Sequence, residues 1–422
     1  MKILIMAMAE LGYGETIIGI SLAKKLRRGG HFCYFVICAE HDKILSSEGF
    51  EYYTIPHRMG YKAQYRIDEI IVRIKPDVII LADYFVWYAI FCHNYSIRDT
   101  WFILKYDIPV LPIDIWSLEE IGYEIDCLSR RNPIWDKMKD MPVYLRPVPF
   151  GRYKNIDSKV MLFTLDNLVE YQEHKKDEAR ESIGIGKKEK VVLMAIGNGW
   201  QVNHPNNPHS THINDLLFDG MPEFLSKQMS FLPEDTKIIY VGNRILGLEK
   251  YLYGRICNMP SCGIDCFNNM LYACDVFLTM NMSSTTLAKA IYAGIPSVVL
   301  TNPYEMCGPD DVDSVFAALG VGEGYEYQWA RKYTPLSKFR IAPVGLYYVM
   351  EKLMQDNRYF KAMVEINMFD RNKVLTTIKR LLSQDKGDSE LMQQRNRYFA
   401  EISAEQPNGF IDRFNQLMRQ IV

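Results

Sequence analysis

Two series of short apolar runs, one in each half of the chain, constrain the fold more than any other feature of the sequence. In the first half we expect strands at residues 3–7, 32–38, 52–55, 78–82 and 110–113. Helix-like stretches separate them, at residues 15–28, 41–48, 64–74 and 95–106. Runs rich in Val and Ile that lack polar alternation and alternate with helices are typical of a parallel sheet covered on both faces.

The second half repeats this pattern after a charged stretch at 173–181. Its expected strands are 191–196, 237–241, 256–258, 276–279 and 297–300, and its expected helices are 213–229, 246–254, 266–273 and 284–293. Beyond residue 335 the pattern is helical to the end. The sequence therefore predicts an α/β protein with two doubly wound, Rossmann-like domains facing a cleft. We place the N-terminal domain at 1–165, a linker at 166–188, the C-terminal domain at 189–385 and a helical tail, which could pack back on the first domain, at 386–422.

Composition excludes several classes of protein. The chain has 422 residues, 49 basic and 51 acidic side chains and a net charge of −2, so nothing in it resembles the basic surface of a nucleic-acid-binding protein. Its nine cysteines, an odd number, indicate a reduced set rather than a disulfide framework. No signal peptide is expected at the N-terminus, and no apolar run reaches the roughly 20 residues of a membrane span. These features predict a cytoplasmic protein without an integral membrane segment.

A glycine turn follows the first predicted strand. Gly12 and Gly14 flank Tyr13, and Glu15 would open the next helix. Glycines at such a turn allow positive φ and let a ligand approach the backbone, although the same pair can simply tighten a corner. Glu15 at the carboxyl edge of the sheet could act as a general base towards an alcohol. The alternative is a first-turn Glu that complements the helix dipole.

Four consecutive hydroxyl residues precede the predicted helix at 284–293. They are Ser283, Ser284, Thr285 and Thr286. Hydroxyls and free amides at a helix N-terminus form an anion site suited to a diphosphate. The alternative is that one serine merely caps the helix, which would explain one hydroxyl and not four.

These motifs together resemble the GT-B glycosyltransferases of the UDP-glycosyltransferase and MurG-like superfamily. The glycine turn resembles that family's first loop, and residues 180–199 resemble the entry into its donor domain. Residues 275–300, an Asp, an apolar strand, a small-residue turn, a helix and Gly-Ile-Pro, resemble its most specific block. The resemblance implies that the donor binds the C-terminal domain, at Gly197, Asn198 and Gly199 and at the hydroxyl run, and that the acceptor binds the N-terminal domain.

The sequence departs from the family at two positions. Many members carry His as the base where this chain has Glu15, and a carboxylate can perform the same proton transfer. The Glu that usually holds the nucleotide ribose is replaced by Lys289, which cannot accept hydrogen bonds from ribose hydroxyls but could attract a phosphate. Asp310 and Asp311 resemble the acidic dipeptide that contacts the donor sugar, or they form the acidic first turn of a helix.

Two other groups of residues are weaker candidates for a functional site. Three imidazoles, those of His204, His209 and His212, lie close together, but no Cys or acidic residue completes a zinc-ligand spacing, so we expect no metal site. We interpret Cys257, Cys262 and Cys266 as buried structural thiols.

The sequence thus predicts an inverting, metal-independent glycosyltransferase that needs no cofactor beyond its nucleotide-diphosphate sugar and acts on a small-molecule or lipid-linked acceptor. Glu15 is the expected base, with Gly12, Gly14, Asp83 and Asp114 on the acceptor side. Two alternatives remain open: a hydrolase or epimerase of nucleotide sugars with the same fold, and a catalytically silent accessory protein.

Overall fold

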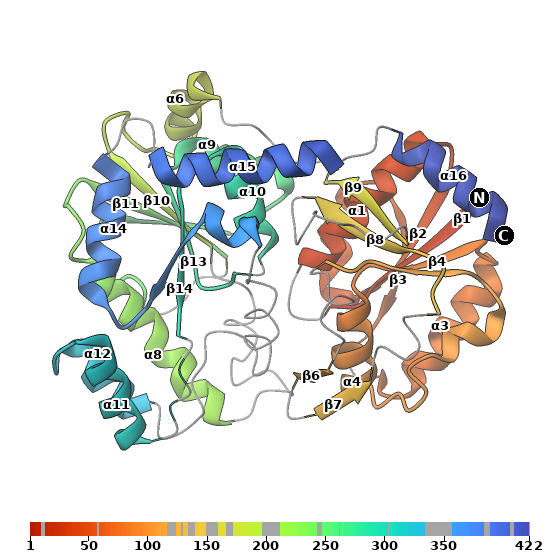
Figure 1. Ribbon diagram of the computed structural model, residues 1–422, viewed down its shortest axis with the longest axis horizontal. Coiled ribbons are helices and arrows are strands. Elements are labelled where there is room, and N and C mark those ends of the chain that lie inside the picture. Colours follow the sequence, from red (N-terminus) through yellow and green to blue (C-terminus); the bar gives the residue numbers. More distant parts are fainter. Residues whose placement is uncertain are drawn as a thin grey trace. The chain divides into compact units, whose positions relative to one another are not determined.

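The computed structural model describes residues 1–9, 13–56, 59–115, 124–127, 130–133, 140–148, 159–165, 172–195, 212–242, 247–260, 262–282, 284–302, 304, 306, 308–333, 357–383, 389–405 and 409–421. The chain forms two compact units (Figure 1). Unit 1 comprises Met1–Asn167, Tyr348–Tyr359 and Tyr398–Val422, and unit 2 comprises Leu168–Tyr347 and Phe360–Arg397. The C-terminal part of the chain therefore contributes to both units. The predicted tail at 386–422 is divided between them near residue 397.

Unit 1 is built on a five-stranded parallel sheet in the order β3-β2-β1-β4-β5. The strands are β1 (Lys2–Ala7), β2 (Phe32–Cys38), β3 (Glu51–Ile55), β4 (Val78–Leu81) and β5 (Val110–Pro112). All of β4, and β1 from Ile3 onward, are buried, which explains their continuous apolar sequences. Because all five strands are parallel, their carboxyl ends share one edge of the sheet.

Helices of unit 1 follow these strands: α1 (Gly14–Arg28), η1 (Ala39–His41), α2 (Asp42–Ser47), α3 (Lys62–Ile74), η3 (Val86–Phe91), α4 (Cys92–Asn94) and η4 (Phe102–Tyr106). A glycine sets how closely α1 approaches the sheet. A Cβ at Gly19 would lie 3.3 Å from side-chain atoms of both Ile5 and Phe35, so these side chains would have to shift slightly to accept a larger residue. The helix α1 thus packs closely against β1 and β2 at this point.

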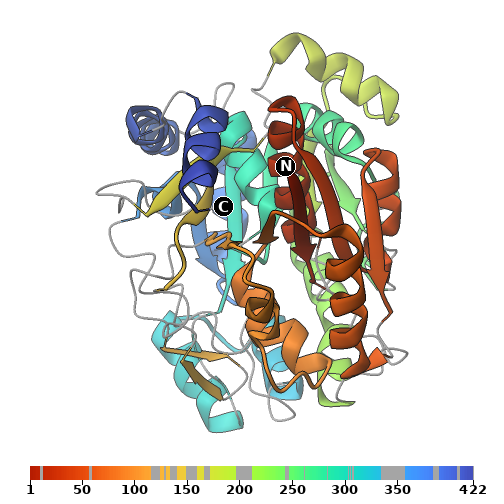
Figure 2. The same cartoon turned by 90° about the vertical axis from the view of Figure 1, so that its right-hand side faces the viewer.

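Smaller strand pairs complete unit 1. β6 (Glu124–Cys127) and β7 (Arg130–Pro133) are antiparallel, whereas β8 (Tyr144–Val148) and β9 (Val160–Thr164) are parallel. The helix α16 (Phe410–Ile421) packs beside β9, where the rings of Phe410 and Phe163 are 6.0 Å apart (Figure 2). Phe414 of the same helix is buried against the ring of His31. The end of the described chain is thereby part of the N-terminal unit's core.

Unit 2 repeats the architecture with a six-stranded parallel sheet in the order β12-β11-β10-β13-β14-β15. The strands are β10 (Lys190–Ala195), β11 (Thr236–Val241), β12 (Ile256–Met259), β13 (Val276–Thr279), β14 (Ser297–Thr301) and β15 (Val364–Asn367). The helices are α6 (Glu173–Ser182), α8 (His212–Met229), α9 (Ile264–Ala273), α10 (Thr285–Ala293), α11 (Pro309–Leu319), α12 (Tyr325–Tyr333) and α14 (Arg371–Ser383). Two elements, η7 (Arg358–Ala362) and α15 (Ser389–Glu405), have residues in both units.

Three predictions about elements were wrong. Of the helix expected at 95–106, only η4 is present. The helical turns before it begin earlier than expected, directly after Asp83, whose carboxylate accepts the N–H groups of Phe85 and Val86. Residues 247–254 form turns rather than a helix, because Gly247 has a φ of 92° and Gly254 a φ of 70°. The region beyond 335 is not wholly helical, since β15 adds an edge strand to the sheet.

Among the described residues, no helix is both long enough and apolar enough to span a bilayer.

Candidate active site

The order of the strands in the sheet of unit 1 reverses between β1 and β4. From β1 the chain proceeds to β2 and β3 on one side, and β4 and β5 lie on the other. In open α/β sheets, ligands bind outside the carboxyl ends of the strands at this switch point. Glu15 follows β1 and Asp83 follows β4, so two acids that are far apart in the sequence both come after strands that are neighbours in the sheet.

Glu15 lies in the first turn of α1 with its Oε2 atom buried and without a hydrogen-bond partner. Burial removes the solvation of the charged form and raises the pKa of this carboxyl from 4.5 to about 7, against the opposing effect of a hydrogen bond from its own backbone. A carboxyl whose pKa lies near neutrality is suited to proton transfer at ordinary pH.

Asp83 is the second member of the pair. Burial, and next the negative charge of Glu15, raise the pKa of its carboxyl from 3.8 to about 7. Its Oδ1 accepts hydrogen bonds from the N–H groups of Phe85 at 2.8 Å and Val86 at 3.2 Å, which favour the ionised form. Asp83 therefore caps the helical turns after β4, and the charge of Glu15 acts on it.

The start of α1 is held by contacts from η1, the short helix that follows β2. The Oγ1 atom of Thr16 lies 2.6 Å from Nδ1 of His41 in a buried hydrogen bond. The His41 ring also packs against Tyr13, with centroids 4.7 Å apart. These contacts flank Glu15 on both sides along the chain and fix the backbone from which its side chain extends. Sequence reasoning did not identify His41, because only the strand order places it beside the glycine turn.

The remaining acceptor-side predictions have different outcomes. Gly14 is the first residue of α1, whereas Gly12 lies outside the described residues. Asp114 is fully buried after β5, and its Oδ2 lies 3.8 Å from Nη2 of the equally buried Arg146 on β8. Because its charge is engaged within the core, we assign Asp114 to the structure of unit 1 and leave it out of the proposed site.

Unit 2 has its own switch point, between β10 and β13. The helix α10 begins after β13 at this position. Ser284 is its N-cap and accepts the N–H of Thr286 at 3.2 Å, and the two hydroxyl oxygens are 2.5 Å apart. Thr285 is half-buried in the first turn. The capping alternative thus holds for Ser284, which engages both the amide and the hydroxyl of Thr286, and the Thr285 hydroxyl and the other first-turn amides remain at this helix end.

Four of the predicted donor residues lie outside the described residues: Gly197, Asn198, Gly199 and Ser283. Asp310 and Asp311 are exposed in the first turn of α11, where an acidic residue complements the helix dipole. A contact of either carboxylate with a donor sugar stays a prediction.

Lys289 is buried on α10, with its Nζ 5.9 Å from the centroid of the Phe267 ring on α9. Its charge also acts on Cys262, where it opposes the raised pKa that burial and a hydrogen bond with Cys266 produce. The prediction that these thiols are buried was wrong for Cys266, which is exposed, while Cys262 and Cys257 are half-buried. Cys262 lies in the loop before α9, Cys266 lies in the first turn of that helix, and Cys257 lies on the edge strand β12, so none of the three is beneath the sheet.

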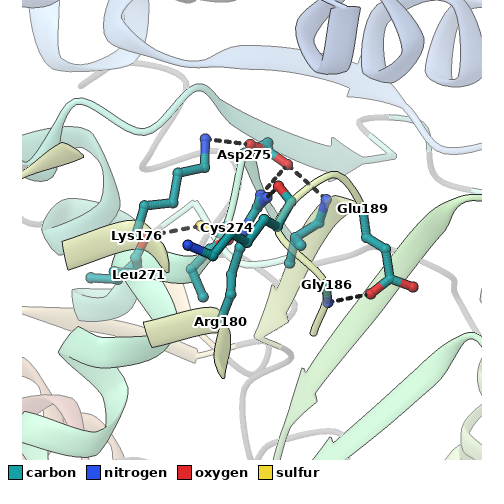
Figure 3. A network of polar contacts seen from close by, with 10 residues as sticks. Lys176, Arg180, Gly186, Glu189, Leu271, Cys274 and Asp275 are labelled. Atoms are coloured by element: carbon teal, nitrogen blue, oxygen red, sulfur yellow. Dashed lines mark hydrogen bonds and ion pairs between the residues drawn. The ribbon is translucent and has the colours of Figure 1, made fainter. Parts of the chain in front are cut away.

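Within unit 2, an ion-pair network holds α6 at the edge of the sheet opposite the carboxyl ends of the strands (Figure 3). Asp275, just before β13, accepts from Arg180 at 2.8 Å, from Lys176 at 2.9 Å and from the backbone N–H of Val191 at 2.8 Å. Arg180 also donates to the carbonyls of Ala273 and Lys187. The network joins the two sequence blocks, 180–199 and 275–300, on which the family resemblance was based.

Within the described part of the chain, no group of three or more His, Cys, Asp or Glu side chains is placed to hold a metal ion. His204 and His209 lie outside that part, and His212 is the first residue of α8.

Comparison with known proteins places this architecture in a family. A family model matches residues 22–409, and the family is DUF6365, described as a family of unknown function. The chain belongs to this family. No curated protein matches the DUF6365 chain.

Solved structures share the fold of this DUF6365 protein over its whole length. Spinosyn forosaminyltransferase SpnP is 13% identical with a TM-score of 0.56, covering 100% of this chain and 99% of its own. The calicheamicin glycosyltransferase CalG4 is 11% identical with a TM-score of 0.53 and the same coverage. The glycosyltransferase SsfS6 from Streptomyces sp. SF2575, complexed with thymidine diphosphate, is 13% identical with a TM-score of 0.51 and covers 99% of each chain. The predicted GT-B fold is confirmed.

Proposed function

We propose that this protein is an inverting, metal-independent glycosyltransferase that moves a sugar from a nucleoside diphosphate to an acceptor hydroxyl. The observation that carries the proposal is the buried Oε2 of Glu15, which has no hydrogen-bond partner and lies at the switch point of unit 1. The fold supports it, since SpnP, CalG4 and SsfS6 bear the names of glycosyltransferases and SsfS6 was crystallised with thymidine diphosphate.

In the proposed reaction, Glu15 removes the proton of the acceptor hydroxyl. The hydroxyl oxygen forms a bond to the anomeric carbon as the bond from that carbon to the diphosphate oxygen breaks. The proton stays on Glu15 and the nucleoside diphosphate leaves with the bonding electrons. Attack from the face opposite the leaving group inverts the anomeric configuration.

The departing diphosphate would be stabilised at the N-terminus of α10. The Thr285 hydroxyl and the first-turn amides other than that of Thr286 can donate to phosphate oxygens, and the helix dipole places a partial positive charge there. Lys289 adds a full positive charge on the same helix. A preorganised set of donors of this kind can stabilise the leaving group without a metal ion.

The first experiment is calorimetric and thermal-shift binding with a panel of nucleoside diphosphates and their sugar conjugates. A ligand at 100 times its dissociation constant should stabilise the folded state by about 2.7 kcal/mol. The binder then serves as donor in assays with an acceptor panel, and the product's anomeric configuration is read by NMR. Steady donor consumption without any acceptor would indicate a hydrolase or epimerase. The absence of binding at millimolar concentrations would overturn the proposal in favour of an accessory protein.

A further inference from the structure

We propose that the helix α3 of unit 1, with Tyr61 at its N-cap, is a dimerisation surface that binds the same helix of a second copy of this chain, with the two helices antiparallel (Figure 1). The surface contains none of the residues of the candidate active site. A dimer of this kind is a property of unit 1 by itself and does not depend on the proposed function.

The helix α3 has two apolar stripes, whereas one is enough to hold a surface helix on its sheet. The first stripe is buried and consists of Ala63, Ile67, Ile70, Ile71 and Ile74. The second is exposed and consists of Tyr61, Tyr65 and Val72, whose side chains are 59%, 60% and 61% exposed. At about 100° per residue these three side chains lie within about 40° of one another around the helix, on the side opposite the first stripe.

The exposed stripe differs from the rest of the described surface. Elsewhere in the described chain, large apolar side chains that are exposed occur one to a segment. On α3 they follow one line, and the rings of Tyr61 and Tyr65 pack edge to face with centroids 6.3 Å apart. Exposed apolar side chains that lie together and have a polar rim mark interaction sites. The stripe therefore predicts a partner with a matching apolar face.

The stripe has the spacing of a coiled-coil seam. From Tyr61 the seam reaches Tyr65 after four residues, Asp68 after three more and Val72 after another four, which is the alternation of a heptad repeat. Asp68 is the polar member, and its carboxylate is held by two hydrogen bonds from η4, each 2.7 Å long. A seam of this kind fits another helix that lies along it.

The order of the residues in the seam selects an antiparallel second copy. In a parallel pair in register, Asp68 would face Asp68 of the other copy, and the two carboxylates would repel each other. In an antiparallel pair centred between residues 66 and 67, Tyr61 faces Val72 of the second copy and Tyr65 faces its Asp68. The apolar side chains then cover each other, and the Tyr65 hydroxyl can donate a hydrogen bond to the carboxylate.

The charged residues beside the seam fit the same orientation. Lys62 and Glu69 are exposed on one flank of the stripe and are seven residues apart. In the antiparallel pair, Lys62 lies next to Glu69 of the second copy, and the two-fold axis repeats this contact. Arg66 donates to Oε2 of Glu69 at 2.9 Å within the helix, which holds the carboxylate on this flank. The charges of α3 are thus complementary to those of a second α3.

The first test is the mass of the full chain by sedimentation velocity between about 1 and 200 μM, since a contact of two helices lies at the weak end of protein interfaces. We expect the average mass to rise towards twice that of one chain. Val72→Lys puts a charge into the seam and should keep the protein monomeric over the whole range. The matched control, Tyr253→Lys, changes an exposed aromatic residue of unit 2 and should dimerise like the wild type.

Both substitutions are at exposed positions, so both variants should fold, which circular dichroism checks. A wild type that stays monomeric at every concentration would overturn the proposal. So would a dimer that Val72→Lys leaves intact, because the contact would then lie on another surface.

The second test exchanges the charges on the flank. Lys62→Glu alone places Glu against Glu at both contacts, and Glu69→Lys alone places Lys against Lys, so each should weaken dimerisation by about tenfold. An equimolar mixture of the two variants places Glu against Lys at both contacts and should dimerise as tightly as the wild type. A mixture that dimerises no better than either variant alone would overturn the antiparallel pairing. None of these measurements involves turnover, so their outcome is independent of whether a donor or acceptor is found.

Discussion

The two units share a strand order around their switch points but present opposite chemistry there. At the carboxyl edge of unit 1, the switch point carries the half-buried acids Glu15 and Asp83. At the carboxyl edge of unit 2, the helix α10 presents amides, hydroxyls and Lys289. Asp275, a half-buried acid just before β13, lies at the other edge and is neutralised by Arg180 and Lys176.

This contrast shows how one architecture supplies two kinds of site. A parallel sheet determines where a ligand binds, because it gathers the loops after its strands at one edge. The first residues of the helices that follow determine what is bound. An acid in the first turn of α1 favours protons and hydroxyls, and an uncharged cap on α10 leaves the amides available to anions. The predictions below test this division of roles.

Glu15→Gln should have the largest effect. Loss of a general base typically lowers turnover by about 10²–10⁴-fold. Because the substitution lies in unit 1, the dissociation constant of the nucleoside diphosphate should stay the same by calorimetry. The exposed Glu69→Gln on α3 is the control. Full turnover in Glu15→Gln would remove this residue from the base role. Weaker binding of the nucleoside diphosphate would contradict the assignment of donor binding to unit 2.

Arg180→Ala should have the next largest effect, and this effect should be on stability. Arg180 is buried and donates to Asp275, Ala273 and Lys187, so truncation leaves a carboxylate and two carbonyls with fewer donors. We expect the free energy of unfolding of unit 2 to fall by about 3 kcal/mol in urea denaturation.

The control is Lys187→Ala. Its ion pair with Asp177 also measures 2.8 Å but is exposed to solvent, so its loss should change stability little. Equal effects of the two substitutions would mean that burial does not determine the contribution of this network.

Ser284→Ala should have a smaller effect, on both stability and binding. Loss of the N-cap that accepts the Thr286 amide costs about 1 kcal/mol. The control is Ser314→Ala on α11, whose hydroxyl only donates to the carbonyl of Asp310. If α10 binds the donor phosphates, Ser284→Ala should also weaken nucleoside diphosphate binding in calorimetry, whereas the control should not. Unchanged binding would place the phosphates elsewhere.

Lys289→Met should have the smallest effect. Met retains the apolar part of the side chain against Phe267 but removes the charge. We expect affinity for a nucleoside diphosphate to fall by about threefold to fivefold, with little change for the corresponding nucleoside. Comparison of the two ligands by calorimetry separates loss of a phosphate contact from loss of packing. An equal loss for both ligands would refute the phosphate role.

Most of the sheet could be predicted from the sequence because its strands are buried on both faces. The strand predicted at 32–38 matches β2, and the strand predicted at 276–279 matches β13. β15 was missed because an edge strand is short and half-exposed, so its sequence lacks a continuous apolar run. The residues at 247–254 satisfied a helical pattern that two left-handed glycines interrupt.

The candidate site was predictable only in part. Glu15 was identified because it adjoins a glycine turn, which is a local signal. Its relation to Asp83 depends on β1 lying next to β4, and strand order is not contained in any one segment. The same holds for Arg180 and Asp275, which are 95 residues apart in the chain. Long-range pairs of this kind become visible only once the topology is known.

The assignment of Tyr398–Val422 to unit 1 has a consequence for the order in which the protein is made. Domains generally fold in sequence as the chain leaves the ribosome. Here the core of the N-terminal unit includes Phe414 and Met418. These two residues are synthesised after Arg397, the last residue of unit 2, so the N-terminal unit cannot complete its core before then. The unit that is begun first is therefore completed last. An exchange of the second unit between relatives must likewise leave this final helix with the N-terminal unit.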